Sequence, residues 1–85
     1  MPPPTRSVDS ALSAYLLNAI AAQNLVVLKT PAGHAQPLAV TLDRSPLDGV
    51  LGTLAGDDTV LLVTPDAETA RRLVERLSPK PPPPA

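Results

Sequence analysis

Two adjacent aspartates, Asp57 and Asp58, lie between two apolar runs in the sequence GTLAGDDTVLLV (52–63). Aspartates are good turn residues, because the side chain hydrogen-bonds its own backbone and tolerates left-handed geometry. Paired carboxylates can also serve as metal ligands or as a catalytic acid pair. A third use is to recognise an organic cation, because the planar fork of N–H donors on a guanidinium matches carboxylates in a bidentate manner.

The rest of the sequence gives little support to metal binding or catalysis. A zinc or calcium site needs several His, Cys or acidic ligands at matching spacing, but the chain has one histidine, His34, and no cysteine. A small hydrolase would need a nucleophile or a base, and only His34 offers one near the pair. We interpret His34 as a loop or helix-start residue. We therefore expect no metal ligand, no catalytic residue and no enzyme.

The composition indicates one small domain that associates with copies of itself. The chain has 85 residues, a net charge of −1 and no Phe or Trp, and domains of this size are marginally stable alone. Its seven basic residues are scattered, whereas a nucleic-acid surface clusters them. No apolar run approaches the roughly 20 residues that span a bilayer, and the segment MPPPTRS lacks the apolar region of a signal peptide. We expect a cytoplasmic domain that contacts neither membrane nor DNA.

Proline-rich segments flank the central domain. Most of the 12 prolines fall in residues 1–10 and 79–85, which we interpret as extended tails or as the remnant of a linker. The domain itself is expected over residues 11–78. The proline-rich start would suit the end of a linker, so we expect this chain to be one domain of a longer protein.

The first half of the domain is predicted to form two strands and a helix. The β-branched run NLVVLKT indicates a strand over about 24–30, joined by a bend at AAQN to a strand over about 14–22. A helix is the alternative for the first segment, because apolar residues recur there at 3.6-residue spacing. The breaker cluster TPAGH precedes a helix beginning between residues 33 and 36, with Pro37 in its first turn.

The second half of the domain is predicted to form a hairpin and a helix. The runs 50–55 and 59–64 are joined by GDD, where Gly56 supplies the freedom of the turn. Thr64 is the expected cap of the last helix, and Pro65 its first residue. The expected buried stripe of that helix comprises Ala70, Leu73, Val74 and Leu77.

The element order predicts an α+β fold of ββαββα type, a two-layer sandwich in which a four-stranded antiparallel sheet carries two helices on one face. The strands LVVL and TVLLVT are apolar on both faces, unlike strands with one solvated face. The face without helices must also be covered. A second subunit is the expected cover.

Four segments resemble, in order and spacing, the C-terminal domain of bacterial arginine repressors: NLVVLKT (24–30), GHAQ (33–36), LD (42–43) and GTLAGDDTVLLV (52–63). The resemblance covers about residues 14–77. It implies a ββαββα module that forms trimers, which pair face to face into hexamers with L-arginine, the co-repressor, bound between the trimers. It also implies a winged helix-turn-helix domain in the full-length protein that binds operator DNA.

The resemblance also implies which residues contact L-arginine. Asp57 and Asp58 match the acidic pair of the family, and Asp43 matches a further acidic contact. Gln36 matches a Gln or His position, and two residues of the preceding strand match backbone contacts, namely Thr53 and Ala55. The alternative reading is a stand-alone amino-acid-sensing domain that regulates a partner protein rather than DNA.

Two positions depart from the family pattern. Pro37 stands where the family usually has an ordinary helix former, and His34 replaces a small or amide residue.

Asp57 and Asp58 would bring like charges together between facing trimers, which is unfavourable where water is excluded. We therefore hypothesise that arginine acts as a bridge that neutralises this charge.

Overall fold

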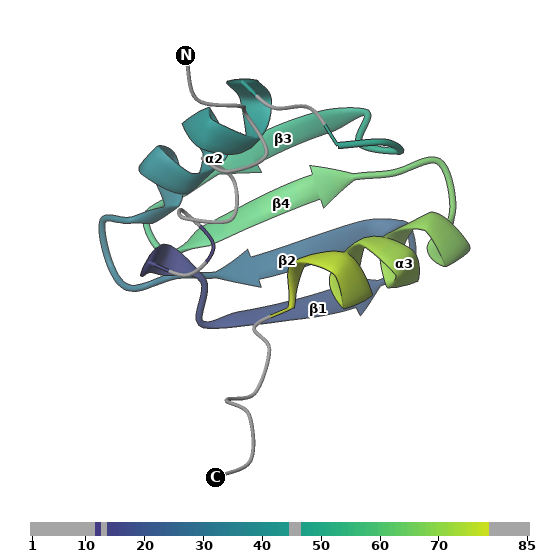
Figure 1. Cartoon of the computed structure of the whole chain (residues 1–85), viewed down its shortest axis with the longest axis horizontal. Coiled ribbons are helices and arrows are strands. Elements are labelled where there is room, and N and C mark those ends of the chain that lie inside the picture. The colour runs from purple at the N-terminus through teal and green to yellow at the C-terminus, as the bar shows by residue number, and fades with distance from the viewer. Residues whose placement is uncertain (1–11, 13, 45–46, 79–85) are drawn as a thin grey trace, which may run out of the picture.

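The computed structural model of the protein describes residues 12, 14–44 and 47–78. The proline-rich ends predicted at 1–10 and 79–85 lie outside the described residues. The described elements follow the predicted ββαββα order (Figure 1). They are β1 (Asn18–Ala22), β2 (Leu25–Lys29), α2 (Ala35–Arg44), β3 (Gly52–Ala55), β4 (Thr59–Val63) and α3 (Ala67–Leu77).

The four strands form one antiparallel sheet in the order β1-β2-β4-β3. The two apolar strands therefore lie at its centre, where Val26 pairs with Leu62 and Leu28 with Val60. β3 is an edge strand, and it is joined to β4 by the turn that carries the aspartate pair. The predicted α+β fold is confirmed.

Both helices cover the same face of the sheet. α2 packs against β3 and β4, and α3 packs against β1 and β2 (Figure 1). The buried core between the layers consists of aliphatic side chains, since the chain has no Phe or Trp. Its largest fully buried members are Leu28, Leu38, Leu62, Leu77, Val26 and Val60.

The first strand is shorter than predicted. The expected strand over 14–22 begins only at Asn18, and Ala14 and Tyr15 are helical. The backbone N–H of Leu16 donates to the carbonyl of Leu12 at 3.0 Å, which closes a helical turn, and Leu16 is buried in the core. The helical alternative was therefore correct for this short stretch, because its apolar residues pack under the helices before the chain joins the sheet.

The β3–β4 hairpin was predicted correctly in place but not in its backbone detail. The strands cover 52–55 and 59–63 rather than 50–55 and 59–64. Gly56 does not adopt positive φ, so its predicted role as the flexible turn residue is wrong. Its N–H donates to the carbonyl of Thr59 at 2.8 Å, which continues the ladder to the turn. Among the described glycines, Gly33 and Gly49 have positive φ, in the loops on either side of α2.

Helix α2 begins as predicted, and α3 begins two residues later than predicted. Pro37 lies in the first turn of α2, where its missing N–H costs no helical hydrogen bond. Asp66, not Thr64, caps α3, because its carboxylate accepts the N–H of Thr69 at 2.7 Å. Thr64 is buried, and its hydroxyl lies 2.8 Å from the carbonyls of Asn24 and Asp66.

The face of the sheet opposite the helices is apolar and open. It carries alternate residues of each strand, and Ile20 and Leu54 remain 48% and 67% exposed there. Val27 and Leu61 are half-buried between them. Such a surface fits association with another copy. Within residues 12–78 as described, no helix is both long and apolar enough to cross a membrane.

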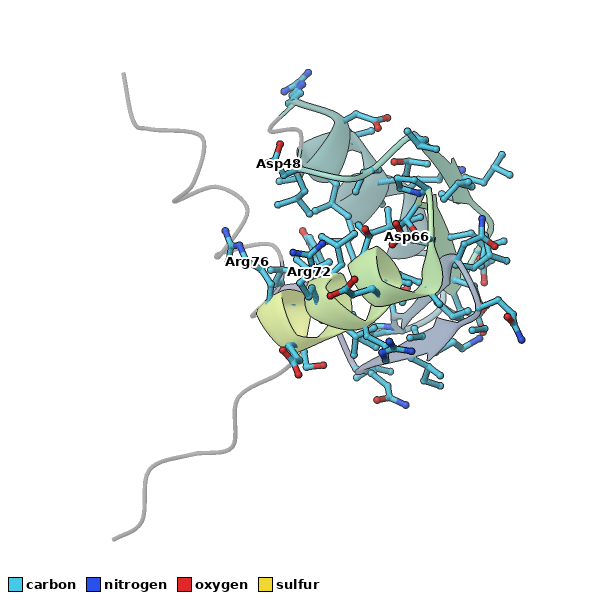
Figure 2. All side chains as sticks on the ribbon, turned by 90° about the vertical axis from the view of Figure 1, so that its right-hand side faces the viewer. Asp48, Asp66, Arg72 and Arg76 are labelled. Atoms are coloured by element: carbon cyan, nitrogen blue, oxygen red, sulfur yellow. The ribbon has the colours of Figure 1, made fainter. Side chains whose placement is uncertain are left out.

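The cap of α3 gives a pH-dependent prediction. Figure 2 shows Asp66 at the start of α3 and Arg72 and Arg76 further along it. Hydrogen bonds from Thr69, first from its side chain and then from its backbone N–H, hold the pKa of Asp66 below its usual range. A depressed carboxyl pKa contributes stability that is fully present above the unfolded pKa of about 3.9 and is lost as the pH falls through the lower folded value.

We therefore expect Asp66→Ala to lower the midpoint of urea denaturation at pH 7. The difference in midpoint between the variant and the wild type should narrow below about pH 4. Glu68→Ala, in the same helical turn but not at the cap, should shift the midpoint less. An equal difference in midpoint between Asp66→Ala and the wild type at pH 7 and at pH 2.5 would contradict this role of Asp66.

Candidate functional site

The turn that carries the aspartate pair is fixed to the loop before α2. The carbonyl of Asp57 accepts the backbone N–H groups of Gly33 at 3.0 Å and Ala35 at 3.2 Å. The carbonyl of Asp58 accepts the N–H of Thr30 at 2.8 Å. Both aspartates are exposed. The backbone of the pair is thus held in place while its carboxylates face outward.

The carboxylate of Asp58 belongs to a small polar network. Thr59 Oγ1 donates to Asp58 Oδ1 at 3.0 Å, and Lys29 Nζ donates to Thr59 Oγ1 at 2.6 Å. Lys29 Nζ also lies 3.6 Å from Asp58 Oδ2. The hydrogen bond from Thr59, followed by the charge of Lys29, lowers the pKa of Asp58. Asp58 is therefore firmly ionised at neutral pH.

The carboxylate of Asp57 differs from that of its neighbour. Among the hydrogen bonds and ion pairs between described residues, none uses this carboxylate. It lies beside the start of α2, because its own carbonyl accepts the N–H of Ala35. The sequence makes the two aspartates look equivalent, and the structure separates them into one engaged and one available carboxylate.

Gln36 lies beside the aspartate turn. Its Nε2 donates to the carbonyl of Ala55 at 3.1 Å. This carbonyl points away from β4, because the next residue, Gly56, bonds to Thr59 of β4 and the backbone groups of successive strand residues alternate in direction. Backbone groups two residues apart on a strand point the same way, so those of Thr53 also face this edge. β3 therefore presents the backbone groups of Thr53 and Ala55 at the edge of the sheet, where Gln36 already contacts the carbonyl of Ala55.

Asp43 and Thr53 lie at the other end of the same seam between α2 and β3. Asp43 follows Gln36 by seven positions in α2, which is a rise of about 10 Å along the axis. Asp43 and Thr53 line a pocket of about 170 Å³, together with Leu42, Leu47, Val50, Leu51, Gly52 and Leu62. Five of the eight lining residues are aliphatic, and Asp43 is the acidic one.

The six predicted contact residues thus fall into two groups along one seam, with Gln36, Ala55 and the aspartate pair at one end and Asp43 and Thr53 at the other. They do not enclose a ligand within one chain. The described residues contain no group of three or more His, Cys, Asp or Glu placed to hold a metal ion. The arrangement is suited to an elongated ligand with a cationic end.

Sequence reasoning missed Lys29 and Thr59. The available signal was Lys29, a lysine at the end of an otherwise apolar strand. It pairs directly across with Thr59, the threonine that follows the aspartates. His34 directly precedes α2, where its ring centroid lies 5.1 Å from that of Tyr15. Its Nδ1 lies 3.1 Å from the carbonyl of Ala32. This placement agrees with a helix-start role.

Comparison with known proteins identifies the family. Residues 12–78 match the family described as "Arginine repressor, C-terminal domain". The arginine repressor of Acidobacterium capsulatum is 50% identical over 70 residues, which cover 82% of this chain and 47% of the relative. That of Solibacter usitatus is 51% identical over 63 residues, covering 74% and 43%. That of Bifidobacterium adolescentis is 42% identical over 72 residues, covering 85% and 42%.

The chain spans less than half the length of these curated relatives. Within the chain, however, the family match takes in every described strand and both long helices. It also includes all six predicted contact residues. The chain therefore belongs to the family of arginine repressor C-terminal domains, which is not a family of enzymes.

Proposed function

We propose that this domain binds L-arginine and couples its binding to self-assembly, as the effector-sensing part of a repressor of arginine metabolism. The observation that carries this proposal is the aspartate turn, whose backbone is fixed by three hydrogen bonds while its carboxylates face outward. Family membership supports the choice of ligand.

The charge of the turn suits a guanidinium. Asp57 presents a carboxylate without a partner among the described residues, and the ionised Asp58 lies next to it. A guanidinium is planar, always charged and weakly hydrated, so it can form paired hydrogen bonds with a carboxylate. The proposed contact is therefore between the guanidinium and the Asp57 carboxylate, with Asp58 adding negative charge.

The rest of the seam suits the remainder of the ligand. Gln36 contributes a side-chain amide, and Thr53 and Ala55 contribute edge-strand backbone groups. Asp43 contributes a second acidic position among the residues that line the pocket. An amino acid with two cationic groups and a hydrocarbon stem is complementary to acidic groups separated by an apolar stretch.

The openness of the seam favours a site shared between copies of the chain. We propose trimers that pair into a hexamer, with arginine between the trimers. The exposed apolar face supports association, since Ile20 and Leu54 are otherwise left in water. Lys29 and Thr59 project on that face, so the aspartate pair lies at its rim. A ligand bound there is close to a neighbouring copy.

Binding and assembly are then thermodynamically linked. Facing carboxylates repel each other when the site is empty, and an arginine cation removes this repulsion. A ligand that binds the assembled form better than the separate parts stabilises the assembly. Contact with operator DNA is assigned in this proposal to a separate domain of the full-length protein.

The first test removes the charge of Asp57. Asp57→Asn keeps the size of the side chain but loses its charge-assisted hydrogen bonds, so we expect L-arginine binding to weaken at least about 10-fold in calorimetry. The trimer should persist in sedimentation. Glu75→Gln is the matched control, because Glu75 is exposed on α3, which packs against β1 and β2 and not at the seam between α2 and β3. An Asp57→Asn chain that titrates arginine normally would show that the site is assigned wrongly.

The second test changes the ligand instead of the protein. Citrulline is nearly isosteric with arginine but neutral, so it cannot offset the charge of the aspartates. We expect it to bind at least about 10-fold more weakly and to leave the assembly state unchanged. Equal heats and affinities for arginine and citrulline would exclude the charge mechanism.

A further inference from the structure

Lys29 places a positive charge beside the aspartate pair that the proposed ligand contacts leave unexplained. It is the last residue of β2 and lies directly across from Thr59 of β4. Its ammonium reaches Thr59 Oγ1 at 2.6 Å and Asp58 Oδ2 at 3.6 Å. Because the Thr59 hydroxyl also donates to Asp58 Oδ1, Asp58 is held by two neighbours on the central strands.

The position of Lys29 on the sheet links this ion pair to the open face. Side chains alternate along a strand, so Lys29 projects on the same side as Val27 and Leu25, away from both helices. In the single chain its side chain is 41% exposed and that of Asp58 is 56% exposed. Water therefore screens the pair in the single chain. An interface that covers the open face would strengthen it.

Lys29 changes the net charge that copies of the chain bring to a shared site. Asp57 and Asp58 alone would contribute two negative charges, and the ammonium of Lys29 leaves one. The contacts of Lys29 involve Asp58 and not Asp57. One carboxylate is thus neutralised within the chain, and the other stays available to an external cation.

We propose that Lys29 is an internal cation that neutralises Asp58 and thereby sets how strongly assembly depends on arginine. This inference rests on the proposed function of the aspartate turn. With Lys29 in place, copies without ligand repel each other less, and one guanidinium per chain balances the remaining charge. Without it, the empty assembly is weaker, and arginine has more repulsion to relieve. Lys29 is a positioning residue in this scheme, since it acts through Asp58.

The test compares charge and shape at position 29. Lys29→Met keeps a long apolar stem without charge, Lys29→Arg keeps the charge, and Arg71→Met removes an exposed charge from α3 on the other face of the sheet. Sedimentation of each folded chain, without and with saturating L-arginine, gives the concentration at half-assembly in both states. The concentration at half-assembly without arginine, divided by the concentration with arginine, measures how strongly assembly depends on arginine.

We expect this ratio to rise at least about 2-fold in Lys29→Met relative to the wild type. The rise should come from weaker assembly without ligand, and it should disappear in 1 M salt, which screens the charges. Lys29→Arg and Arg71→Met should keep the wild-type ratio. By NMR titration, the pKa of the Asp58 carboxyl should increase in Lys29→Met and not in Lys29→Arg.

The outcomes separate this inference from the function on which it rests. A wild-type chain whose assembly does not respond to arginine contradicts the proposed function, and the inference falls with it. A responsive wild type with an equal or smaller ratio in Lys29→Met overturns the role of Lys29 alone. An unchanged Asp58 pKa in Lys29→Met also overturns it, whether or not the ligand binds.

Discussion

The two backbone hydrogen bonds that the carbonyl of Asp57 accepts from Gly33 and Ala35 join the β3–β4 turn to the start of α2. The candidate site depends on this junction, because it brings the aspartates, Gln36 and the free edge of β3 together. The main chain performs the positioning, so the carboxylates are not consumed in holding the turn. A fixed turn that leaves the Asp57 carboxylate available is preorganised for a ligand, which lowers the entropic cost of binding.

The second constraint is the size of the domain. A four-stranded sheet with two helices covers only one of its faces, and the central strands place apolar residues on both. In the proposed assembly, another copy buries the open face, and the aspartates at its rim resist that approach while they are unpaired. On this proposal, the apolar face favours assembly and the charged rim opposes it, so a cation bound at the rim promotes assembly. The proposed role of Lys29 is to reduce the repulsion at the rim from within the chain.

The sequence predicted what depends on local patterns, and it missed what depends on tertiary contacts. The element order, the place of Pro37 and the two-sided apolar strands were all readable, because periodicity and turn residues are local signals. The predicted cap of α3 was wrong because Thr64 is buried, and its hydroxyl donates to the carbonyl of Asn24, forty residues away in the sequence. The difference between Asp57 and Asp58 depends on Lys29, which only the pairing of β2 with β4 brings near.

The central claim is that the aspartate turn shares a guanidinium between neighbouring copies of the chain. A crystal structure of the protein grown with saturating L-arginine tests this most directly. The account predicts the guanidinium within hydrogen-bond distance of the Asp57 carboxylate, with a neighbouring copy completing the site. A turn that faces open solvent, far from every neighbouring copy and from the bound arginine, would contradict it.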